Sequence, residues 1–287
     1  MKKFLAMVCA AALVLAMFTG CGGSQTDLLQ KIKEEGKMTV ALSPDFAPME
    51  IVDISKSGQD QYVGFDVTLA QYIADELGVE LVIEAMSFDA SQAAVSTKAV
   101  TMSISGYSYT EDRAENFEIS DGYYTNNESN QCILVPAGQA ADYAAAEAFS
   151  GKKLGAQNAS LQYDLLTSQL PDAEPSLVTD LNTGVLELAA GNIDGLCVAK
   201  GNGEMIMDAN PGQFEFATWE FAIDDDANVI LLPKGETALL EEVNKILAKA
   251  NEAGYYPVWY AEAVEYAKSA NAQEVSIPDE GGADSEG

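Results

Sequence analysis

The chain has 287 residues, of which 48% are apolar, so it can bury one large hydrophobic core or two moderate ones. Its 45 acidic and 15 basic side chains give a net charge of −30, which argues against nucleic-acid binding and against attachment to anionic lipid through basic residues. The sequence contains no histidine. This excludes histidine-based metal sites and the Ser-His-Asp and Cys-His catalytic arrangements, and we expect no metal and no cofactor.

The N-terminal residues have the layout of a secretory signal. Two lysines precede an apolar run over residues 4–18, which is short for a membrane span. The run ends at Phe18-Thr19-Gly20-Cys21, which resembles a bacterial lipoprotein cleavage site. We expect a signal peptide over residues 1–20, a lipid on Cys21 and a linker over residues 21–36, with the protein anchored on the extracytoplasmic face of the cell membrane. An ordinary secretory signal and an uncleaved anchor are the alternatives.

The next elements alternate between strand and helix. Residues 38–42 form a short apolar strand, and two prolines in residues 43–50 stiffen the loop that presents Phe46. Gly64-Phe65-Asp66 opens a helix, with Asp66 placed to cap it and a glycine at its end. Another apolar strand follows. This rhythm predicts a parallel sheet covered by helices. The buried face of the helix is predicted to comprise Leu69, Ala70, Ile73 and Leu77.

Residues 104–124 contain the most informative pattern in the chain. An apolar strand leads into Ser105, Ser108 and Thr110, and Arg113 follows. The planar guanidinium matches a carboxylate through two parallel hydrogen bonds, while the hydroxyls supply neutral donors at a strand end, where α/β folds bind ligands. We therefore predict a site for a small acid. The alternative is a surface arginine paired with a neighbouring glutamate.

A second lobe is predicted after Tyr124. A polar segment precedes an apolar strand over residues 132–135, whose length suits a hinge crossing. Further along, Asn158-Ala159-Ser160 precedes a helix over residues 161–170. The first turn of a helix has unpaired N–H groups and the positive end of the helix dipole. Ser160 therefore either caps this helix alone or also contacts an anionic ligand.

The chain is predicted to return to the first lobe near residues 221–229. Residues 228–233 have the pattern of a strand, and a long amphipathic helix follows from Thr237 to just before Gly254. The aromatic residues after this helix are predicted to pack beneath it. Residues 271–287 are rich in Glu, Asp, Gly and Ser, which predicts a disordered acidic tail.

Two cysteines lie within the predicted lobes. Cys132 and Cys197 both occur in apolar, strand-like runs. In an exported protein a disulfide between them and a pair of buried thiols are both open, because the pairing cannot be read from a sequence. We favour the buried thiols.

Several motifs in this order resemble one known family. They are Phe46-x-Pro48, Gly64-Phe65-Asp66, Thr110-x-x-Arg113 and Ser120-Asp-x-Tyr-Tyr124. The chain is similar, from about Lys37 to Ala267, to the amino-acid-type extracellular solute-binding proteins (family 3) of ABC importers, in their lipoprotein form. The resemblance implies an α/β fold: a two-lobed, periplasmic-binding-protein-like clamp in which each lobe is a mainly parallel sheet flanked by helices, with two hinge crossings. Lobe 1 would comprise residues 37–129 and 226–270, and lobe 2 residues 130–225.

The resemblance also implies a ligand site in the cleft. Arg113 would hold the ligand carboxylate from one lobe, Ser160 would meet the same carboxylate from the other, and Gln157 matches a family glutamine in that turn. Two aromatic residues, Phe46 and Phe88, would enclose the ligand side chain, although packing in the core is an alternative for each. The full expected ligand-binding set is Arg113, Thr110, Ser105, Gly106, Ser160, Phe46, Phe88, Tyr107 and Gln157.

The function implied is binding without catalysis. We expect a lipid-anchored, monomeric component of an ABC importer that binds an amino acid or a related small carboxylate, contacts the membrane permease and the membrane lipid, and does not bind nucleic acid. One alternative is an enzyme on the same scaffold, similar to the amino-acid-derived dehydratases. Another is a sensor or adhesin that no longer serves transport.

One departure from the family bears on the ligand. Members that bind free α-amino acids carry an acid for the ligand ammonium five residues after the position of Asp194, but this chain has Ala199 there. An ammonium without a counter-charge in a dry cleft is costly. Either Glu204 or Asp45 substitutes, or the ligand lacks a free ammonium. Asp194 itself is expected to be structural.

Overall fold

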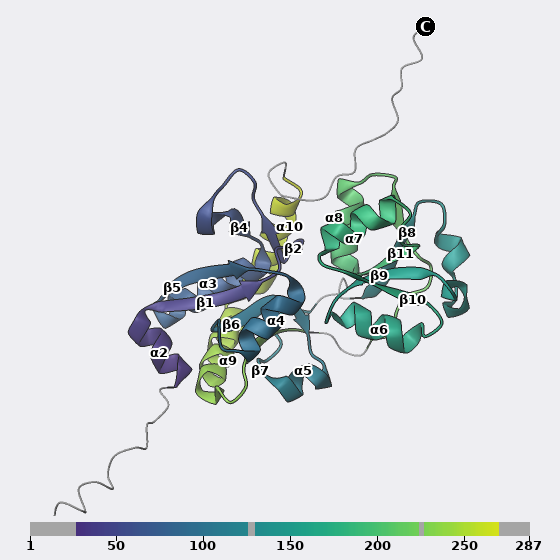
Figure 1. Ribbon diagram of the computed structural model, residues 1–287. Helices are drawn as coiled ribbons and strands as arrows, with labels where there is room; N and C mark the ends of the chain where they lie inside the picture. The colour runs from purple at the N-terminus through teal and green to yellow at the C-terminus, as the bar shows by residue number, and fades with distance from the viewer. Residues whose placement is uncertain (1–26, 126–129, 224–226, 270–287) are drawn as a thin grey trace, which may run out of the picture.

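The computed structural model describes residues 27–125, 130–223 and 227–269, and it contains two α/β lobes side by side (Figure 1). Each lobe is built on a five-stranded sheet. The chain leaves the first lobe after Tyr124 and re-enters it at Asn228, and these two residues form a β-bridge. The two crossings between the lobes therefore start side by side. The expected two-lobed α/β fold is confirmed.

The first sheet has the strand order β5-β1-β6-β13-β7. The strand β1 pairs in parallel with both β5 and β6, whereas β13 pairs antiparallel with β6 and β7. The strand that follows the return crossing, β13, thus runs against its neighbours. The strands are β1 (Lys37–Leu42), β5 (Glu80–Ala85), β6 (Met102–Ser108), β7 (Phe117–Ile119) and β13 (Asn228–Pro233).

The second sheet repeats this plan with the order β10-β9-β11-β8-β12. Parallel pairs join β9 to β10 and β11, while β8 is antiparallel to β11 and β12. The strand predicted as a hinge crossing, β8, lies inside this sheet and is the first strand after the crossing. Both sheets are therefore mixed, because the first strand after each crossing runs antiparallel to its neighbours. The strands are β8 (Gln131–Pro136), β9 (Lys153–Gln157), β10 (Glu174–Val178), β11 (Gly195–Ala199) and β12 (Phe214–Phe216).

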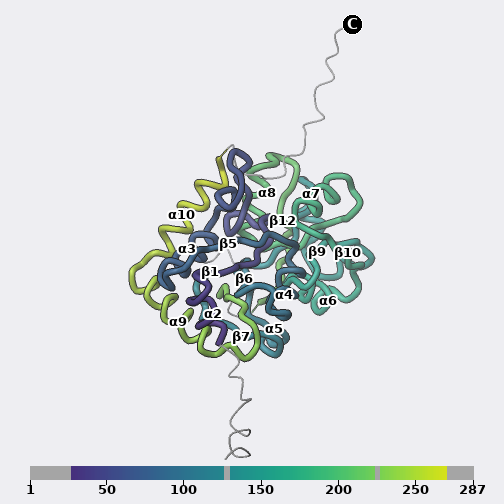
Figure 2. The backbone as a smooth tube through the Cα atoms, turned by 60° about the vertical axis from the view of Figure 1, so that its left-hand side comes forward, coloured from purple at the N-terminus to yellow at the C-terminus, as the bar shows by residue number. Residues whose placement is uncertain are grey.

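Helices cover both sheets (Figure 2). In the first lobe they are α2 (Leu28–Glu35), α3 (Phe65–Leu77), α4 (Phe88–Ser96), α5 (Glu111–Asn116), α9 (Thr237–Glu252) and α10 (Tyr255–Ala267). In the second lobe they are α6 (Leu161–Gln169), α7 (Leu181–Ala189) and α8 (Lys200–Ala209), with the short 3-10 turns η2 (Ala140–Tyr143) and η3 (Ala146–Phe149). Among the described residues, no helix combines the length and apolarity needed to cross a membrane.

A small three-stranded sheet lies beside the cleft-facing loop of the first lobe. It comprises β2 (Asp45–Phe46), β3 (Glu50–Val52) and β4 (Tyr62–Val63), with the 3-10 turn η1 (Gly58–Gln61) before β4. Phe46 lies at the end of β2, so the stiff loop predicted from the two prolines is anchored to β3 by strand pairing.

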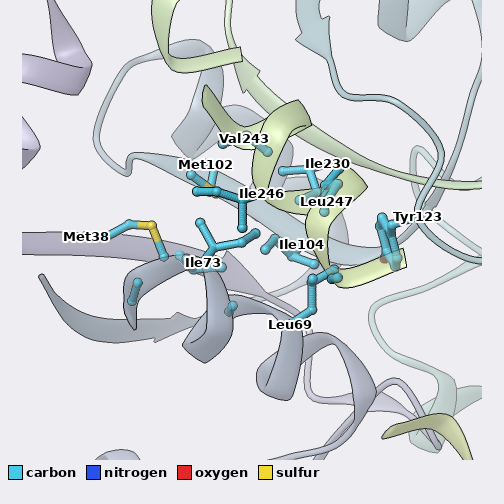
Figure 3. Close-up of a cluster of buried hydrophobic side chains, with 14 of the residues drawn as sticks. Met38, Leu69, Ile73, Met102, Ile104, Tyr123, Ile230, Val243, Ile246 and Leu247 are labelled. Carbon is cyan, nitrogen blue, oxygen red and sulfur yellow. The ribbon is translucent and has the colours of Figure 1, made fainter. Parts of the chain in front are cut away.

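The core of the first lobe lies between the sheet and the helices α3 and α9 (Figure 3). The predicted face of α3 is buried throughout, with Leu69, Ala70 and Ile73 fully inaccessible. On the same face of the sheet, α9 contributes Val243 and Leu247. A fully buried aliphatic side chain of this size contributes about 1.5–3 kcal/mol to folding, so this face fixes α3 on the sheet.

Asp66 was predicted to cap α3, but it does not. The N-cap is Gly64, at φ 129°, and Asp66 lies in the first turn with no exposed surface. A Cβ atom at residue 64 would lie 2.3 Å from the carbonyl oxygen of Met49, so only glycine fits there. Asp66 instead accepts hydrogen bonds from the backbone N–H of Gly106 at 2.7 Å and from the hydroxyl of Tyr123 at 2.8 Å.

Part of the expected N-terminal linker is helical. The helix α2 begins after Asp27, which accepts a hydrogen bond from the Leu29 N–H, and ends at Gly36 in the left-handed conformation. It docks on the first lobe because Ile32 is 2% exposed and joins the core. The expected signal peptide, the lipidated Cys21 and the acidic tail over residues 271–287 lie outside the described residues.

The two thiols are free and buried. Cys132 and Cys197 lie on the adjacent strands β8 and β11, one register position apart. The favoured interpretation of two buried thiols is confirmed, and the disulfide does not form.

Candidate ligand-binding site

Two adjoining cavities lie at the seam between the lobes. The first, here called the Arg113 cavity, is lined by Ser43, Asp45, Phe46, Phe88, Ser105, Gly106, Ser108, Arg113, Gln157, Leu161 and Gln162. The second, here called the α8 cavity, is lined by Phe46, Ala47, Pro48, Met49, Gly106, Ser108, Tyr124, Gln131, Gln162, Ala199, Gly201, Asn202, Asn228 and Tyr260. Four residues, Phe46, Gly106, Ser108 and Gln162, line both. The two cavities therefore form one continuous cleft with contributions from both lobes.

Arg113 is placed in the cleft by the start of α5. Thr110 is the N-cap, and its hydroxyl accepts a hydrogen bond of 3.1 Å from the Arg113 N–H. The helix therefore begins directly after β6 and puts Arg113 in its first turn. Thr110 itself does not line either cavity. Its hydroxyl accepts in the cap, and this hydrogen bond helps to position Arg113.

The Arg113 guanidinium lies against two neighbouring aromatic rings, whose centroids are 4.9 Å apart. Its central carbon lies 5.7 Å from the ring centroid of Phe88 and 5.2 Å from that of Tyr107. The side chain is only 4% exposed. Aromatic rings at this distance favour a cation in a partly desolvated site through the charge distribution of their π-systems. Arg113 is therefore not a surface arginine in an exposed ion pair, which was the alternative.

The same guanidinium connects the lobes. Nη1 donates to the carbonyl of Ser108 at 2.7 Å, and Nη2 donates to the carbonyl of Ala159 in the second lobe at 3.0 Å. Ala159 has a positive φ of 58°, and its carbonyl also accepts a hydrogen bond from Gln92 at 3.2 Å. Arg113 thus lies where the first lobe meets the start of α6.

Tyr107 is a core residue and not a ligand contact. It has no exposed surface, and its hydroxyl is hydrogen-bonded to Ser91 and, at 2.9 Å, to Ser103. Burial raises the pKa of the Tyr107 phenol to about 12, so it is neutral at physiological pH. Tyr107 lines neither cavity, whereas the next residue of β6, Ser108, lines both.

Ser105 lines the Arg113 cavity, but its hydroxyl is committed within the first lobe. It donates to Glu50 Oε1 at 2.5 Å and accepts from the Ser43 N–H at 3.0 Å. Gly106 lines both cavities with φ 57°, a conformation that favours glycine. A Cβ atom on Gly106 would lie 2.5 Å from the ring of Phe46, so this glycine lets the Phe46 ring pack against the strand end.

The second lobe contributes the turn between β9 and α6. Ser160 is the N-cap of α6: its hydroxyl accepts from the Tyr163 N–H at 3.1 Å and donates to the Gln157 carbonyl at 2.8 Å. It is 2% exposed and lines neither cavity, so the capping role alone describes it. The residues of this helix start that reach the cleft are Leu161 and Gln162. Gln157 lines the Arg113 cavity, as expected.

Asp45 is the acid that lines the Arg113 cavity. Its Oδ2 accepts from Gln157 Nε2 at 2.9 Å and from the Leu181 N–H at 2.6 Å, and its Oδ1 accepts from the Ser43 hydroxyl at 2.6 Å. Burial raises the pKa of the Asp45 carboxyl, although the hydrogen bonds from Ser43 and Leu181 act in the opposite direction. Sequence reasoning named Asp45 only as a substitute acid, and did not foresee its contacts with the second lobe.

Further cleft residues were not predicted. They include four carboxamides, Gln131, Gln162, Asn202 and Asn228. Their types carry little signal in a sequence, because Asn and Gln are common in loops and on surfaces. One available signal was missed: Arg113 is the only arginine in the chain.

Behind the cleft wall lies a buried pair of acids, Glu50 and Asp66, neither of which has exposed surface. Burial raises the pKa of Asp66 to about 6. Burial, and next the charge of Asp66, raise the pKa of Glu50 well above its ordinary value. The pair is joined to the cleft through Ser105 and through the Gly106 N–H.

The structural role expected for Asp194 agrees with its contacts. It forms an ion pair with Lys152 at 3.1 Å and accepts from the Lys153 N–H at 2.8 Å. Ala199, by contrast, lies in the cleft as the N-cap of α8. Glu204 lines neither cavity.

Comparison with known proteins identifies the fold and the family. Residues 38–262 match the family described as bacterial extracellular solute-binding proteins, family 3. The arginine-binding extracellular protein ArtP of Bacillus subtilis is 26% identical over 261 residues, covering 88% of this chain and 94% of that protein. The L-cystine-binding protein TcyJ of Escherichia coli is 26% identical over 255 residues, covering 88% of this chain and 91% of that protein.

A solved structure is also similar. The amino acid ABC transporter substrate-binding protein AbpA of Streptococcus pneumoniae, bound to L-arginine, is 30% identical with a TM-score of 0.78, covering 84% of this chain and 99% of that chain. Together with the match over residues 38–262, this similarity extends across both lobes. The chain therefore belongs to family 3 of the bacterial extracellular solute-binding proteins.

Proposed function

We propose that this protein is the extracytoplasmic substrate-binding component of an ABC importer, and that it captures an amino acid or a related small carboxylate between its lobes. The position of Arg113 carries the proposal. Its guanidinium lines a cavity at the seam, lies against the rings of Phe88 and Tyr107, and bonds to carbonyl groups of both lobes. A carboxylate is a stronger acceptor for this fork than a neutral carbonyl, because both partners are charged.

The arrangement suits a clamp that closes on its ligand. Arg113 and Ser108 reach the cavity from the first lobe, while Leu161 and Gln162 reach it from the start of α6 in the second. A ligand that contacts both sides gains more free energy in the closed state than in the open state, and so shifts the population toward closure. A membrane permease can then distinguish the liganded from the unliganded protein by shape, without chemistry in this chain.

The named relatives support binding without catalysis. ArtP is named for arginine, TcyJ for L-cystine, and the structure of AbpA holds L-arginine. These ligands share a carboxylate, the group for which Arg113 is suited, and the three proteins are named as binding proteins. We infer the same role here, for a monomer that delivers its ligand to a permease.

Attachment through a lipid is part of the proposal and rests on the sequence Thr19-Gly20-Cys21 after an apolar signal. One acylated cysteine would hold the protein near its permease. Labelling cells with a radioactive or clickable palmitate analogue tests this. We expect the label in the wild type, none in Cys21→Ala, and unchanged label in Cys132→Ala. Equal labelling of the Cys21→Ala variant would overturn the anchor.

Ligand capture is tested by titration calorimetry of the purified protein against amino acids and small carboxylates, after a thermal-shift screen for hits. Arg113→Met keeps an apolar stem beside the two rings but removes the charge, and we expect it to lose at least about 2 kcal/mol of binding free energy. The control is Lys245→Ala, which removes a positive charge from an ion pair on the exposed side of α9. If no small carboxylate binds, or if Arg113→Met binds like the control, the proposed function is wrong.

A further inference from the structure

The α8 cavity is neutral and rich in carboxamides. Gln131, Gln162, Asn202 and Asn228 line it, and its described lining residues include no Asp, Glu, Lys or Arg. The adjoining Arg113 cavity, in contrast, contains one cation and one acid. The two ends of the cleft are therefore built for different groups of a ligand.

The N-terminus of α8 opens into this cavity. Ala199 is the N-cap and has no side chain that can accept a hydrogen bond, while Gly201 and Asn202 of the first turn line the cavity. The Lys200 N–H donates a hydrogen bond of 2.7 Å to the Asn130 carbonyl. The N–H groups of the next two residues have no acceptor within the helix, and the positive end of the helix dipole faces the same space. This end of the cavity favours an acceptor.

Asn202 adds a requirement for a donor. The side chain is 2% exposed, and its Nδ2 donates to the Ala47 carbonyl at 3.3 Å. Its Oδ1 is buried and has no hydrogen-bond partner among the described residues. A buried carbonyl oxygen without a partner is costly, so a donor from a ligand would be favourable here.

An ammonium group meets only one of these conditions, because it can donate to Asn202 Oδ1 but cannot accept from the first turn of α8. It would face the positive end of α8 with no carboxylate in the cavity. The acid in the adjoining cavity, Asp45, already accepts from Ser43, Gln157 and Leu181. An amide does meet them, because its carbonyl can accept from the first turn of α8 while its N–H donates to Asn202 Oδ1.

We propose that the α8 cavity binds the amide group of the ligand, and that the protein takes N-acylated amino acids or similar small carboxylates that lack a free ammonium. This inference rests on the proposed function, in which the Arg113 cavity holds the carboxylate. The two cavities share Phe46, Gly106 and Ser108, so a carboxylate in one and an adjacent amide in the other belong to a single small molecule.

The test compares matched ligands by titration calorimetry of the purified protein. Each L-amino acid in a panel is paired with its N-acetyl derivative, so that the side chain is constant and only the ammonium is replaced by an amide. For the side chain that binds best, we expect the N-acetyl compound to bind about tenfold or more tightly than the free amino acid, because an unpaired buried ammonium costs at least the corresponding free energy.

Two variants test the residues. Ala199→Asp supplies a carboxylate at the N-cap of α8 and is expected to reverse the preference in favour of the free amino acid. Ala145→Asp is the matched control, since Ala145 is also a helix-start residue without a side-chain cap, at η3 and on the exposed surface. Asn202→Leu removes the unpartnered oxygen at similar volume and is expected to weaken N-acetyl binding by about tenfold, with folding checked by thermal melting.

The outcomes separate this inference from the proposed function. If wild-type protein binds free amino acids as tightly as their N-acetyl derivatives, with loss in Arg113→Met, the inference is wrong and the proposed function stands. If Ala199→Asp and Ala145→Asp prefer N-acetyl compounds to the same degree, the assignment of the α8 cavity is also wrong. If neither class binds and no other small carboxylate does, both the inference and the proposed function fail.

Discussion

The Asp45 carboxylate in the first lobe accepts a hydrogen bond of 2.6 Å from the backbone N–H of Leu181 in the second. Leu181 is the first residue of α7, so the acid lies at the positive end of a helix dipole. The same oxygen accepts from the Gln157 side chain at 2.9 Å. Asp45 therefore bridges the lobes through both a side chain and a backbone group of the second lobe, beside the cavity that contains Arg113.

Replacing Asp45 is expected to open the clamp. In Asp45→Ala the Leu181 N–H and the Gln157 amide lose a charged acceptor, and each such hydrogen bond contributes about 1.5–3 kcal/mol. We expect a larger radius of gyration by small-angle X-ray scattering without ligand, and ligand affinity reduced by about tenfold or more.

Asp89→Ala is the matched control for this prediction. Asp89 also accepts a hydrogen bond across the seam, from Asn158 at 3.0 Å, but at an exposed position. Its loss is expected to change stability and affinity by less than about 0.5 kcal/mol. Equal effects of the two substitutions on shape and affinity would show that the Asp45 bridge is no more important than an exposed contact.

The close approach of Gly106 to Phe46 predicts the effect of a single methyl group. Gly106→Ala puts a Cβ atom 2.5 Å from the Phe46 ring and keeps a positive φ of 57°. We expect the ring to move into the cleft, with a loss of about 2–5 kcal/mol in stability from backbone strain and overpacking together, and weaker ligand binding. Urea unfolding and calorimetry measure the two effects.

Gly58→Ala isolates the backbone contribution. Gly58 has a similar φ of 64°, but a Cβ atom there has no neighbour within 4 Å. This variant is expected to lose about 1–2 kcal/mol in stability and to keep its ligand affinity. Weaker binding in Gly58→Ala, or normal binding in Gly106→Ala, would contradict the role given to the Phe46 contact.

The two lobe cysteines are expected to be unreactive in the native protein. Burial raises the pKa of Cys132 to about 12 and raises the pKa of Cys197 as well. Because the thiolate is the reactive form, a thiol reagent should label neither residue until the protein unfolds, and reducing agents should leave the melting temperature unchanged. Mass spectrometry of the two peptides, after labelling with and without urea, provides the measurement. Rapid labelling of either peptide without urea would contradict this burial.

Much of the fold follows from periodicity in the sequence. The helical spacing of Leu69, Ile73 and Leu77 predicted the face of α3 that packs in the core of the first lobe, and all three are buried. The direction of β8 and β13 did not follow, because a strand pattern carries no information on whether the chain enters a sheet in parallel or in reverse. The helical character of residues 28–35 was missed because the segment was interpreted by its position after the signal.

The candidate site was predicted less completely than the fold. Arg113 could be selected because its chemistry and its place after a strand agree. Thr110 and Ser160 were predicted to contact the ligand, and the structure shows that both hydroxyls cap helices. A helix cap and a ligand donor have the same sequence signature, so the sequence does not separate the two roles. The bridge from Asp45 to Leu181 joins residues 136 positions apart, and such a contact depends on how the lobes pack.

The buried carboxyls of Glu50 and Asp66 predict a dependence of stability on pH. Burial raises the pKa of Asp66 to about 6, and burial with the charge of Asp66 raises that of Glu50 further above its ordinary value. In the unfolded chain both groups titrate near pH 4, so above that pH the folded protein binds more protons than the unfolded chain. The stabilisation from these protons is complete below about pH 4, and it is lost as the pH rises through about 6 and beyond.

Asp66→Asn is expected to flatten this dependence, because only Glu50 of the pair still titrates, next to a neutral neighbour. At pH 7 it should also lose about 1–3 kcal/mol, since an amide offers one acceptor where the carboxylate accepts from both Gly106 and Tyr123. Urea unfolding at a series of pH values measures both effects. Asp75→Asn is the control, because Asp75 lies on the same helix and accepts only an exposed hydrogen bond from Gln71. It should keep the wild-type pH profile. The prediction fails if the wild type, compared with Asp66→Asn, keeps or gains stability between about pH 4 and about pH 7. The pair would then not be protonated in the folded protein.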